Sequence, residues 1–329
     1  MRLARLPSSL FSVVMATGIV GLASAQAGFR FAALAFQGIA AFALAACWLL
    51  YLGRLARTRH VVAQELADRR LAPGHWTAVA GTSVVGSGCA VLWADVHWAA
   101  ALLALAATAW LIVTVSIAIH VARARAPAAP VGAPWLLAVV ALQSLAVLVG
   151  FVSPATATPL QAWLDTAALT AWLAGIAIYL VLAILLVRQL LRGLDRIDFT
   201  PAWWITMGAM AISALAGAQL VLDAPGVPVL QPLLPVLRAG TLACWTVGTA
   251  WLPLLVVLQV RRGSWRYDFS LWTAVFPLGM YSMASARMGT ALGLPALHAV
   301  AGAAVWVAIA AWLATAGGLL RRMAARPAR

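Results

Sequence analysis

The sequence predicts an all-α integral membrane protein, with ten transmembrane helices paired as five helical hairpins in a quasi-fivefold ring around a central pore. Composition indicates the class, because 64% of the 329 residues are hydrophobic, only 9% are charged, and the mean hydropathy is +0.98. So few charges cannot cover a water-soluble domain, whereas about 20 consecutive apolar residues can cross a bilayer. The distribution of arginines and an internal repeat indicate the arrangement.

Ten apolar segments are each long enough to span a bilayer. They cover residues 8–26, 30–52, 76–93, 97–120, 134–152, 162–187, 202–222, 233–259, 270–287 and 295–319. We expect them to form a single transmembrane domain, 1–329, without a soluble domain. The first segment also has features of a signal peptide, because Arg2 and Arg5 precede it and small residues end it. We favour a retained helix, since the same stretch begins the internal repeat.

The arginines orient these segments. All 22 basic residues are arginine, and 19 of them lie at the two termini or in the loops after the second, fourth, sixth and eighth segments. Only Arg30, Arg238 and Arg287 fall on the other side. The positive-inside rule therefore predicts a multi-pass protein of the plasma membrane (the inner membrane of a bacterium), with both termini cytoplasmic. The net charge of +14 is mainly a topology signal, to which binding of membrane lipids adds little, and it does not indicate nucleic-acid binding.

The odd-numbered segments repeat. Each begins with an aromatic residue, and these anchors are Phe11, Trp76, Trp135, Trp203 and Trp272. Small residues or a proline recur five and ten residues after the anchors, except in the third hairpin. One hairpin used five times makes all the first helices parallel, which predicts a ring with a central hole rather than an inverted-repeat transporter. The even-numbered segments are dominated by Leu, Ala, Val and Ile and suit an outer, lipid-facing layer.

The longest polar stretch is the loop 53–74, GRLARTRHVVAQELADRRLAPG. In a helix, Val61, Val62, Leu66 and Leu71 would face one way and the charges the other. A short amphipathic helix along the cytoplasmic membrane surface is expected.

The ninth segment lies in the stretch 268–287, DFSLWTAVFPLGMYSMASAR, with Phe276 and Pro277 near its middle. A proline is tolerated in a membrane helix where neighbouring groups satisfy the backbone atoms that it leaves unpaired, so the pair indicates a kink beside a cavity. The ring of Phe276 is then a candidate plug for a pore. On the residues alone, the simpler interpretation is an aromatic side chain packed between helices.

Two strings carry a family resemblance. WTAVFPLGMYSMAS, around Phe276, and FSVVMATGIVGLAS, near the N-terminus, resemble the tellurite-resistance/dicarboxylate transporter family. That family includes the slow anion channels of plant guard cells and yeast malate and sulfite carriers. The resemblance covers nearly the whole chain. It implies ten transmembrane helices around a pore, a homotrimer, and a phenylalanine of the ninth helix that occludes the pore, which is matched here by Phe276.

Small, hydroxyl-bearing and methionine side chains of the odd-numbered segments are candidates to line the pore. They are Met15, Thr17, Gly18, Gly81, Thr82, Ser83, Met207, Gly208 and Gly279. Hydroxyl groups and loosened backbone would coordinate a partly dehydrated anion weakly, and Met15 and Met207 share the repeat position of Phe276. The alternative is close packing of helices through small residues, with methionine as a gap-filler.

Arg238 and Arg287 are the non-cytoplasmic arginines nearest to membrane depth, where an unpaired arginine is costly. They predict an outer vestibule that concentrates anions. The alternative is structural pairing with Asp223 or Asp165. No chain of acidic residues or histidines crosses the apolar segments, which favours passive conduction over proton symport.

The remaining reactive residues do not indicate catalysis. Cys47, Cys89 and Cys244 lie in apolar runs without a CxxC pattern, and no histidine pair suits a metal. No metal, cofactor or enzymatic activity is therefore predicted. The predicted function is a channel or facilitative transporter for small anions such as chloride, nitrate, sulfite or malate. The alternative is a proton-coupled C4-dicarboxylate (malate) carrier, or a sulfite or tellurite efflux transporter.

Overall fold

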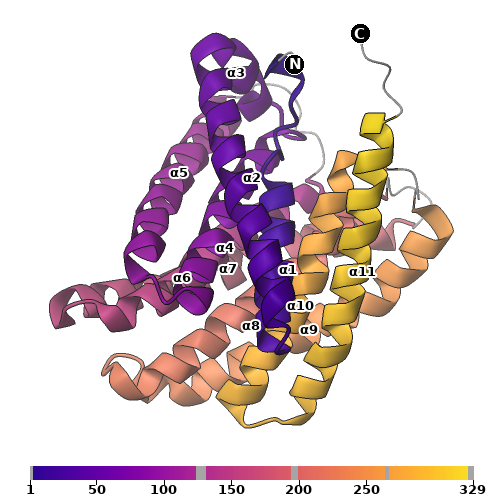
Figure 1. Cartoon of the computed structure of the whole chain (residues 1–329). Coiled ribbons are helices and arrows are strands. Elements are labelled where there is room, and N and C mark those ends of the chain that lie inside the picture. Colours follow the sequence, from indigo (N-terminus) through magenta and orange to yellow (C-terminus); the bar gives the residue numbers. More distant parts are fainter. Residues whose placement is uncertain (1–2, 124–130, 194–198, 264–266, 325–329) are drawn as a thin grey trace.

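The computed structural model of the chain describes residues 3–123, 131–193, 199–263 and 267–324 (Figure 1). Over these ranges it consists of α-helices and short 3-10 turns and contains no strand. The helices are α1 (Ser12–Gln26), α2 (Arg30–Arg57), α3 (Arg59–Ala67), α4 (Thr77–Leu92), α5 (Val96–Arg123), α6 (Leu137–Val152), α7 (Thr158–Leu191), α8 (Ile205–Asp223), α9 (Leu234–Arg262), α10 (Trp272–Leu292) and α11 (Ala296–Ala324).

In the part of the chain that the structure describes, seven helical spans, counted with their flanking 3-10 turns, are long and apolar enough to cross a membrane: those of α2, α5, α6, α7, α8, α9 and α11. This agrees with the predicted class, an all-helical membrane protein. Helices α1 and α4 have only 15 and 16 residues, and α10 carries Arg287 among its 21 residues. That all ten predicted segments span the bilayer remains a prediction.

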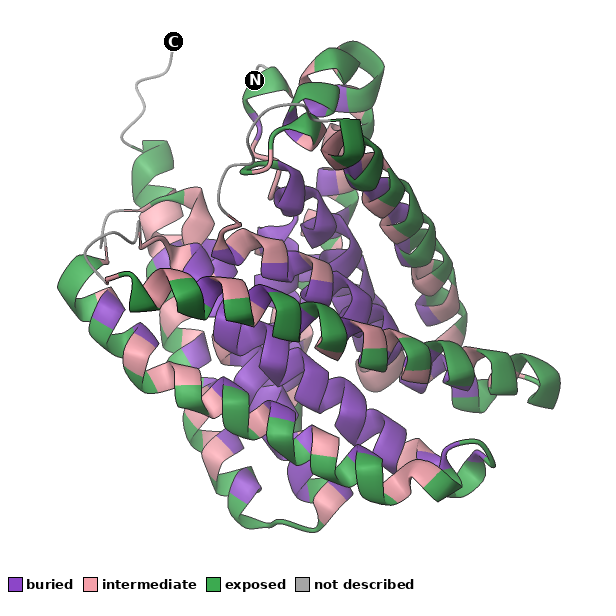
Figure 2. Cartoon of the chain, turned by 180° about the vertical axis from the view of Figure 1, so that it is seen from behind, coloured by how far each residue is buried: buried purple, intermediate pink, exposed green. Residues whose placement is uncertain are grey.

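The helices form an inner and an outer layer. In the apolar stretches of α8 and α6, 94% and 83% of the residues are buried, against 22% in α5, α7 and α11. Figure 2 shows the buried residues concentrated on the helices in the middle, with exposed ones on the outside. The exposed side chains of the outer helices include large apolar ones such as Leu111 and Trp163. A bilayer accommodates such a surface, whereas water would not.

The five inner helices pack against one another in a closed cycle. Helix α1 packs against α4 and α10, α6 packs against α4 and α8, and α8 packs against α10. Each outer helix packs against the inner helix that precedes it, so that α2 lies on α1, α5 on α4, α7 on α6, α9 on α8 and α11 on α10. The hairpins of the sequence are therefore the units of packing.

Tryptophan N–H groups also join consecutive hairpins. Four outer-helix indoles donate to the inner helix of the following hairpin: Trp48 to Thr82 Oγ1 (3.1 Å), Trp172 to the Ser213 carbonyl (2.8 Å), Trp245 to Ser285 Oγ (2.9 Å) and Trp312 to Thr17 Oγ1 (2.9 Å). The last of these bonds attaches the C-terminal helix α11 to α1. In an apolar medium the partners have no water to bond with instead, so each bond fixes the rotation of one helix against another.

Replacing Trp312 with phenylalanine tests this attachment. The variant keeps an aromatic ring but loses the N–H donor, so we expect it to lose about 1 kcal/mol of stability and about 1–2 °C of melting temperature in detergent. Trp306→Phe is the control, because Trp306 is 59% exposed on the same helix and donates no hydrogen bond within the described residues. An equal loss in both variants would indicate that ring area, not the hydrogen bond, is responsible.

The loop 53–74 differs from its predicted pattern. Helix α3 forms there and Val62 is buried, but Leu71 is exposed and Glu65 is buried. The reason is that α2 continues to Arg57, which places Arg54 inside the protein, and Glu65 faces it. The expectation that the charges of this loop lie opposite its apolar residues is therefore wrong for Glu65.

The buried charges form one network. Arg54 Nη2 lies 2.6 Å from Glu65 Oε1, and His75 Nε2 lies 3.3 Å from Glu65 Oε2. The hydroxyl of Tyr51 lies 3.1 Å from His75 Nδ1. Burial alone would raise the pKa of Glu65, but hydrogen bonds from His75 and Arg54 outweigh it and hold the pKa below its ordinary value. Glu65 is thus charged at neutral pH and balances the charge of Arg54.

Candidate pore

Phe276 and Pro277 lie inside helix α10, which continues across the proline. Phe276 is completely buried. Gly208 of α8 permits the close approach of the two helices, because a Cβ atom at Gly208 would lie 2.7 Å from Pro277 Cγ. The proline ring therefore occupies space that only a glycine leaves open, and the position of Phe276 follows from that contact.

Met15 and Met207 come from the two inner helices that pack against α10, namely α1 and α8. Both side chains are completely buried, and both belong to the same apolar cluster as Phe276. Three residues at one repeat position thus come from three inner helices in contact. This arrangement suits an apolar constriction, and it also suits a packed core.

The interior between the inner helices is closed. Every residue from Met15 to Ser24 of α1 is buried, and so is every residue from Ile205 to Val221 of α8. A helix turns once in 3.6 residues, so these runs cover all faces of both helices. Whichever side chains of α1 and α8 face the axis are therefore inaccessible to water in this structure.

The predicted glycines lie where neighbouring inner helices touch. A Cβ atom would meet Val84 at Gly18 (2.7 Å), Val14 at Gly81 (3.3 Å), Pro277 at Gly208 (2.7 Å) and Ile19 at Gly279 (2.9 Å). These contacts join α1 to α4, α8 to α10, and α10 to α1. Close helix packing accounts for all four glycines.

The three predicted hydroxyls differ in their surroundings. Thr17 and Thr82 accept indole N–H groups from the outer helices α11 and α2, so their side chains point outward. The Oγ atom of Ser83 is buried and has no hydrogen-bond partner in the described part of the chain. The Oγ atom of Ser12 at the start of α1, a residue that the repeat does not identify, is also buried without a hydrogen-bond partner in the described part of the chain. A buried hydroxyl without a partner is unfavourable unless water or a ligand reaches it.

The two predicted vestibule arginines lie in different layers. Arg287 is half-buried on the inner helix α10, and its Nε and Nη2 atoms donate to Gln219 Oε1 at 3.1 and 2.8 Å. Gln219 in turn donates to Asp223 at 3.0 Å, so Arg287 is linked to Asp223 through an amide. Arg238 is exposed on the outer helix α9. Only Arg287 therefore belongs to the wall of the inner helices.

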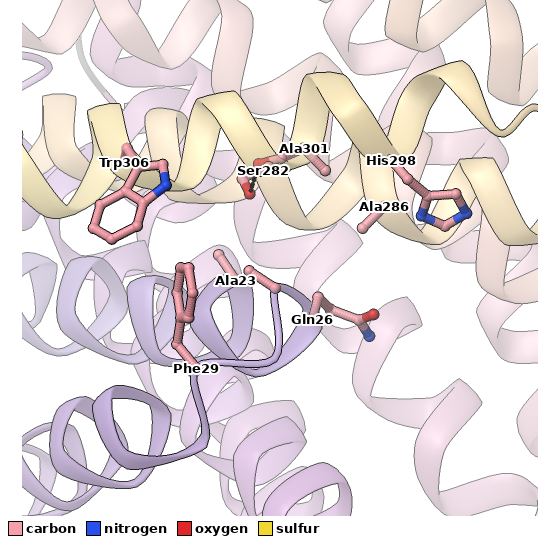
Figure 3. Close-up of a pocket in the computed structure, with 10 residues that line it drawn as sticks. Ala23, Gln26, Phe29, Ser282, Ala286, His298, Ala301 and Trp306 are labelled. Carbon is pink, nitrogen blue, oxygen red and sulfur yellow. Dashed lines mark hydrogen bonds between the residues drawn. The ribbon is translucent and has the colours of Figure 1, made fainter.

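Two hollows lie where α1 ends. Arg30 lines one of about 450 Å³ together with Gln26 and Leu92, at the adjacent ends of α1 and α4. The other, of about 270 Å³, lies between α1, α10 and α11. Figure 3 shows Phe29 and Trp306 together at one end of it, and Gln26 and His298 toward the other. Arg30 was detectable in the sequence as one of three non-cytoplasmic arginines, but its place over two inner helices depends on the fold.

Comparisons with known proteins give one match over most of the chain and several partial ones. The family model of the voltage-dependent anion channels (SLAC1) matches residues 5–320. An uncharacterized membrane protein from two strains of Mycobacterium tuberculosis is 37% identical over 150 residues, which cover 44% of this chain and 75% of that protein. An uncharacterized transporter of Methanocaldococcus jannaschii is 22% identical over 148 residues, which cover 44% of this chain and 42% of that protein.

Proposed function

Because the chain belongs to the voltage-dependent anion channel family, we propose that it conducts small anions through a central pore between its five inner helices. Membership of this family indicates anion transport across a membrane. The observation that carries the proposal is the closed cycle of contacts from α1 through α4, α6, α8 and α10 back to α1. A ring of parallel helices encloses a central axis, and the proposed anion path runs along that axis.

In this proposal ten helices, α1, α2 and α4 to α11, span the bilayer in a single transmembrane domain. Helix α1 is only about 22 Å long at about 1.5 Å per residue, shorter than the hydrocarbon core of about 30 Å. It need not match that thickness, because α2, α4, α10 and α11 cover it and lipid does not. The distribution of arginines supports a plasma-membrane protein with both termini cytoplasmic. The family resemblance adds assembly as a homotrimer.

The gate is Phe276, with Met15 and Met207 beside it. Burial of all three side chains supports a closed state, since a dry apolar constriction blocks ions without a charged barrier. Ser83, whose hydroxyl has no hydrogen-bond partner among the described residues, supplies a lining group for a passing anion. Thr17, Thr82 and the four glycines hold the wall together through their contacts between helices.

The substrates are small anions: chloride, nitrate, sulfite and malate are the test cases. Uncharged lining groups bind an anion weakly, which permits throughput but little discrimination. Arg287 supplies positive charge at the outer end of the inner layer, and Arg30 supplies it in the hollow above α1 and α4. Both attract anions toward the pore.

A coupled carrier is the second candidate. Asp165 of α7 is buried, its Oδ2 atom has no hydrogen-bond partner within the described residues, and Asp223 lies in the network with Gln219. Buried carboxylates at membrane depth are typical of proton-coupled transport. The buried carboxylate of Asp165 is therefore the observation that supports the second candidate, a proton-coupled C4-dicarboxylate carrier, or a sulfite or tellurite efflux transporter.

Anion flux in proteoliposomes decides between the two. Chloride, nitrate, sulfite and malate are offered in turn, under membrane potentials of both signs, with and without a pH gradient, and with protein-free liposomes as control. The channel predicts flux of several anions that follows the membrane potential and ignores the pH gradient. Flux of malate or sulfite alone that requires the pH gradient would contradict the channel and support the carrier.

A further inference from the structure

A groove runs along the side of the molecule over helices α10 and α11. It has a volume of about 480 Å³, and its lining includes Leu271 just before α10, Ala274, Val275 and Leu278 of α10, and six residues of α11 between Val307 and Gly318. Ala310, Ala311 and Ala314 leave the space open because their side chains are small, whereas Tyr267 packs against Gly318. The α11 stretch is about 16 Å long, close to the thickness of one leaflet of the hydrocarbon core.

A polar hollow adjoins one end of this groove. It has a volume of about 240 Å³ and shares Gln259 and Leu271 with the groove. Its lining includes Thr200, Ser270 and Arg262, together with Asp268, whose carboxylate accepts the backbone N–H of Ser270 at 2.8 Å. The groove and the hollow thus form one continuous site, which is apolar where α10 and α11 line it and polar where Asp268 and Ser270 line it.

Two helices that end near the polar hollow carry arginines in their last turns. The last turn of α9 contains Arg261 and Arg262, and the last turn of α11 contains Arg321 and Arg322. Arg322 Nη1 donates to the carbonyl oxygen of Tyr267, a residue that lines the groove, at 3.3 Å. Asp268 offsets one of these four charges. By the positive-inside rule this end lies at the cytoplasmic surface, where anionic lipid headgroups are found.

We propose that the groove and the adjoining hollow hold one anionic phospholipid of the cytoplasmic leaflet. One acyl chain lies against the small residues of α11, and Arg262 and Arg322 bind the phosphate. Arginine suits this ligand because its planar fork of N–H groups matches phosphate oxygens. The acyl chain of the lipid would contact Val275 and Leu278, which lie on either side of Phe276 in the sequence. This lipid site requires that the protein lies in a membrane but not that it conducts anions. Absence of anion flux in proteoliposomes would therefore not contradict it.

Native mass spectrometry of the detergent-purified protein tests the proposal. The protein is titrated with phosphatidylglycerol and with phosphatidylcholine of the same acyl chains. We expect phosphatidylglycerol to bind at least tenfold more tightly. Arg262→Gln and Arg322→Gln should each reduce that preference about fivefold, since one arginine near an anionic headgroup contributes about 1 kcal/mol. Ala314→Phe fills the groove and should weaken binding of both lipids.

The controls are exposed residues outside the site. Arg59→Gln removes a charge from the exposed surface of α3, and Ala303→Phe adds a ring to the exposed surface of α11 one turn before Val307, outside the residues that line the groove. Neither should change lipid binding. Equal binding of both lipids, or an equal effect of Ala303→Phe and Ala314→Phe, would overturn the proposal. Tight binding of glycerol phosphate would indicate a site for soluble anions instead, and loss of the oligomer in Ala314→Phe would indicate that a second copy covers the groove.

Discussion

Phe276→Ala is expected to increase anion flux in proteoliposomes by about tenfold or more. Phe276 is completely buried where α10 meets α1 and α8, and its removal opens an apolar constriction. Each reduction of about 1.4 kcal/mol in the barrier to permeation increases the rate about tenfold. Chloride flux, measured under a fixed membrane potential at matched protein density, is the readout.

The matched variants are Phe276→Leu and Phe36→Ala. Leucine retains an apolar plug, so Phe276→Leu should leave flux near the wild-type value. Phe36 lies on the outer helix α2 against Trp312, so Phe36→Ala removes a comparable ring without touching the axis. Truncation of a buried phenylalanine costs about 3–5 kcal/mol, so folding of every variant is checked by thermal melting. Unchanged flux in folded Phe276→Ala would eliminate the gate, and passage of sodium ions would indicate a leak.

Glu65→Gln is expected to destabilise the protein by about 3–5 kcal/mol. Arg54 is completely buried, and Glu65 is the only acidic residue that pairs with it in the described part of the chain. Removal of one partner leaves a buried charge without compensation, which costs more than the pair itself contributes. Thermal melting in detergent measures the loss.

The double variant Arg54→Met with Glu65→Leu separates charge from packing. It removes both charges while retaining apolar volume, so it should be more stable than Glu65→Gln. If the double variant is as unstable as the single one, packing at these positions and not the buried charge is responsible.

The same pair predicts a dependence on pH. The pKa of Glu65 in the folded protein lies below its ordinary value of 4.5, so the charged form is stabilised by folding. The contribution to stability is therefore complete above about pH 4.5 and is lost as the pH falls through the folded-state pKa. The melting temperature of the wild type should fall on acidification in this range, and the fall should be smaller in Glu65→Gln. Equal slopes in the two proteins would contradict the assignment.

Much of the fold could be predicted from the sequence. Hydropathy and charge predict an all-helical membrane protein, which the seven membrane-capable helices support, and the strings around Phe276 and at the N-terminus indicate a family that the match over residues 5–320 confirms. These features depend on local composition, because the bilayer imposes the same length and polarity on every spanning helix.

The candidate site could be predicted only in part. The repeat identifies Met15, Met207 and Phe276 as equivalent positions, and all three are buried on adjoining helices. It does not distinguish Thr82, which accepts the indole N–H of Trp48, from Ser83, whose hydroxyl has no partner in the described residues. Neighbouring residues point about 100° apart around a helix, and only the rotation of that helix in the fold decides which one faces the axis.

The sequence by itself determined the membrane class, the family and the approximate positions of the apolar segments. Tertiary structure alone decided that Trp312 joins Thr17 across 295 residues, that the four predicted glycines lie between helices, and that Arg54 and Glu65 are buried as a pair. The physical reason is that inner helices are apolar on every face. Their hydrophobic pattern therefore does not indicate which face of each helix points toward the central axis. That rotation is set by the helices that pack against them.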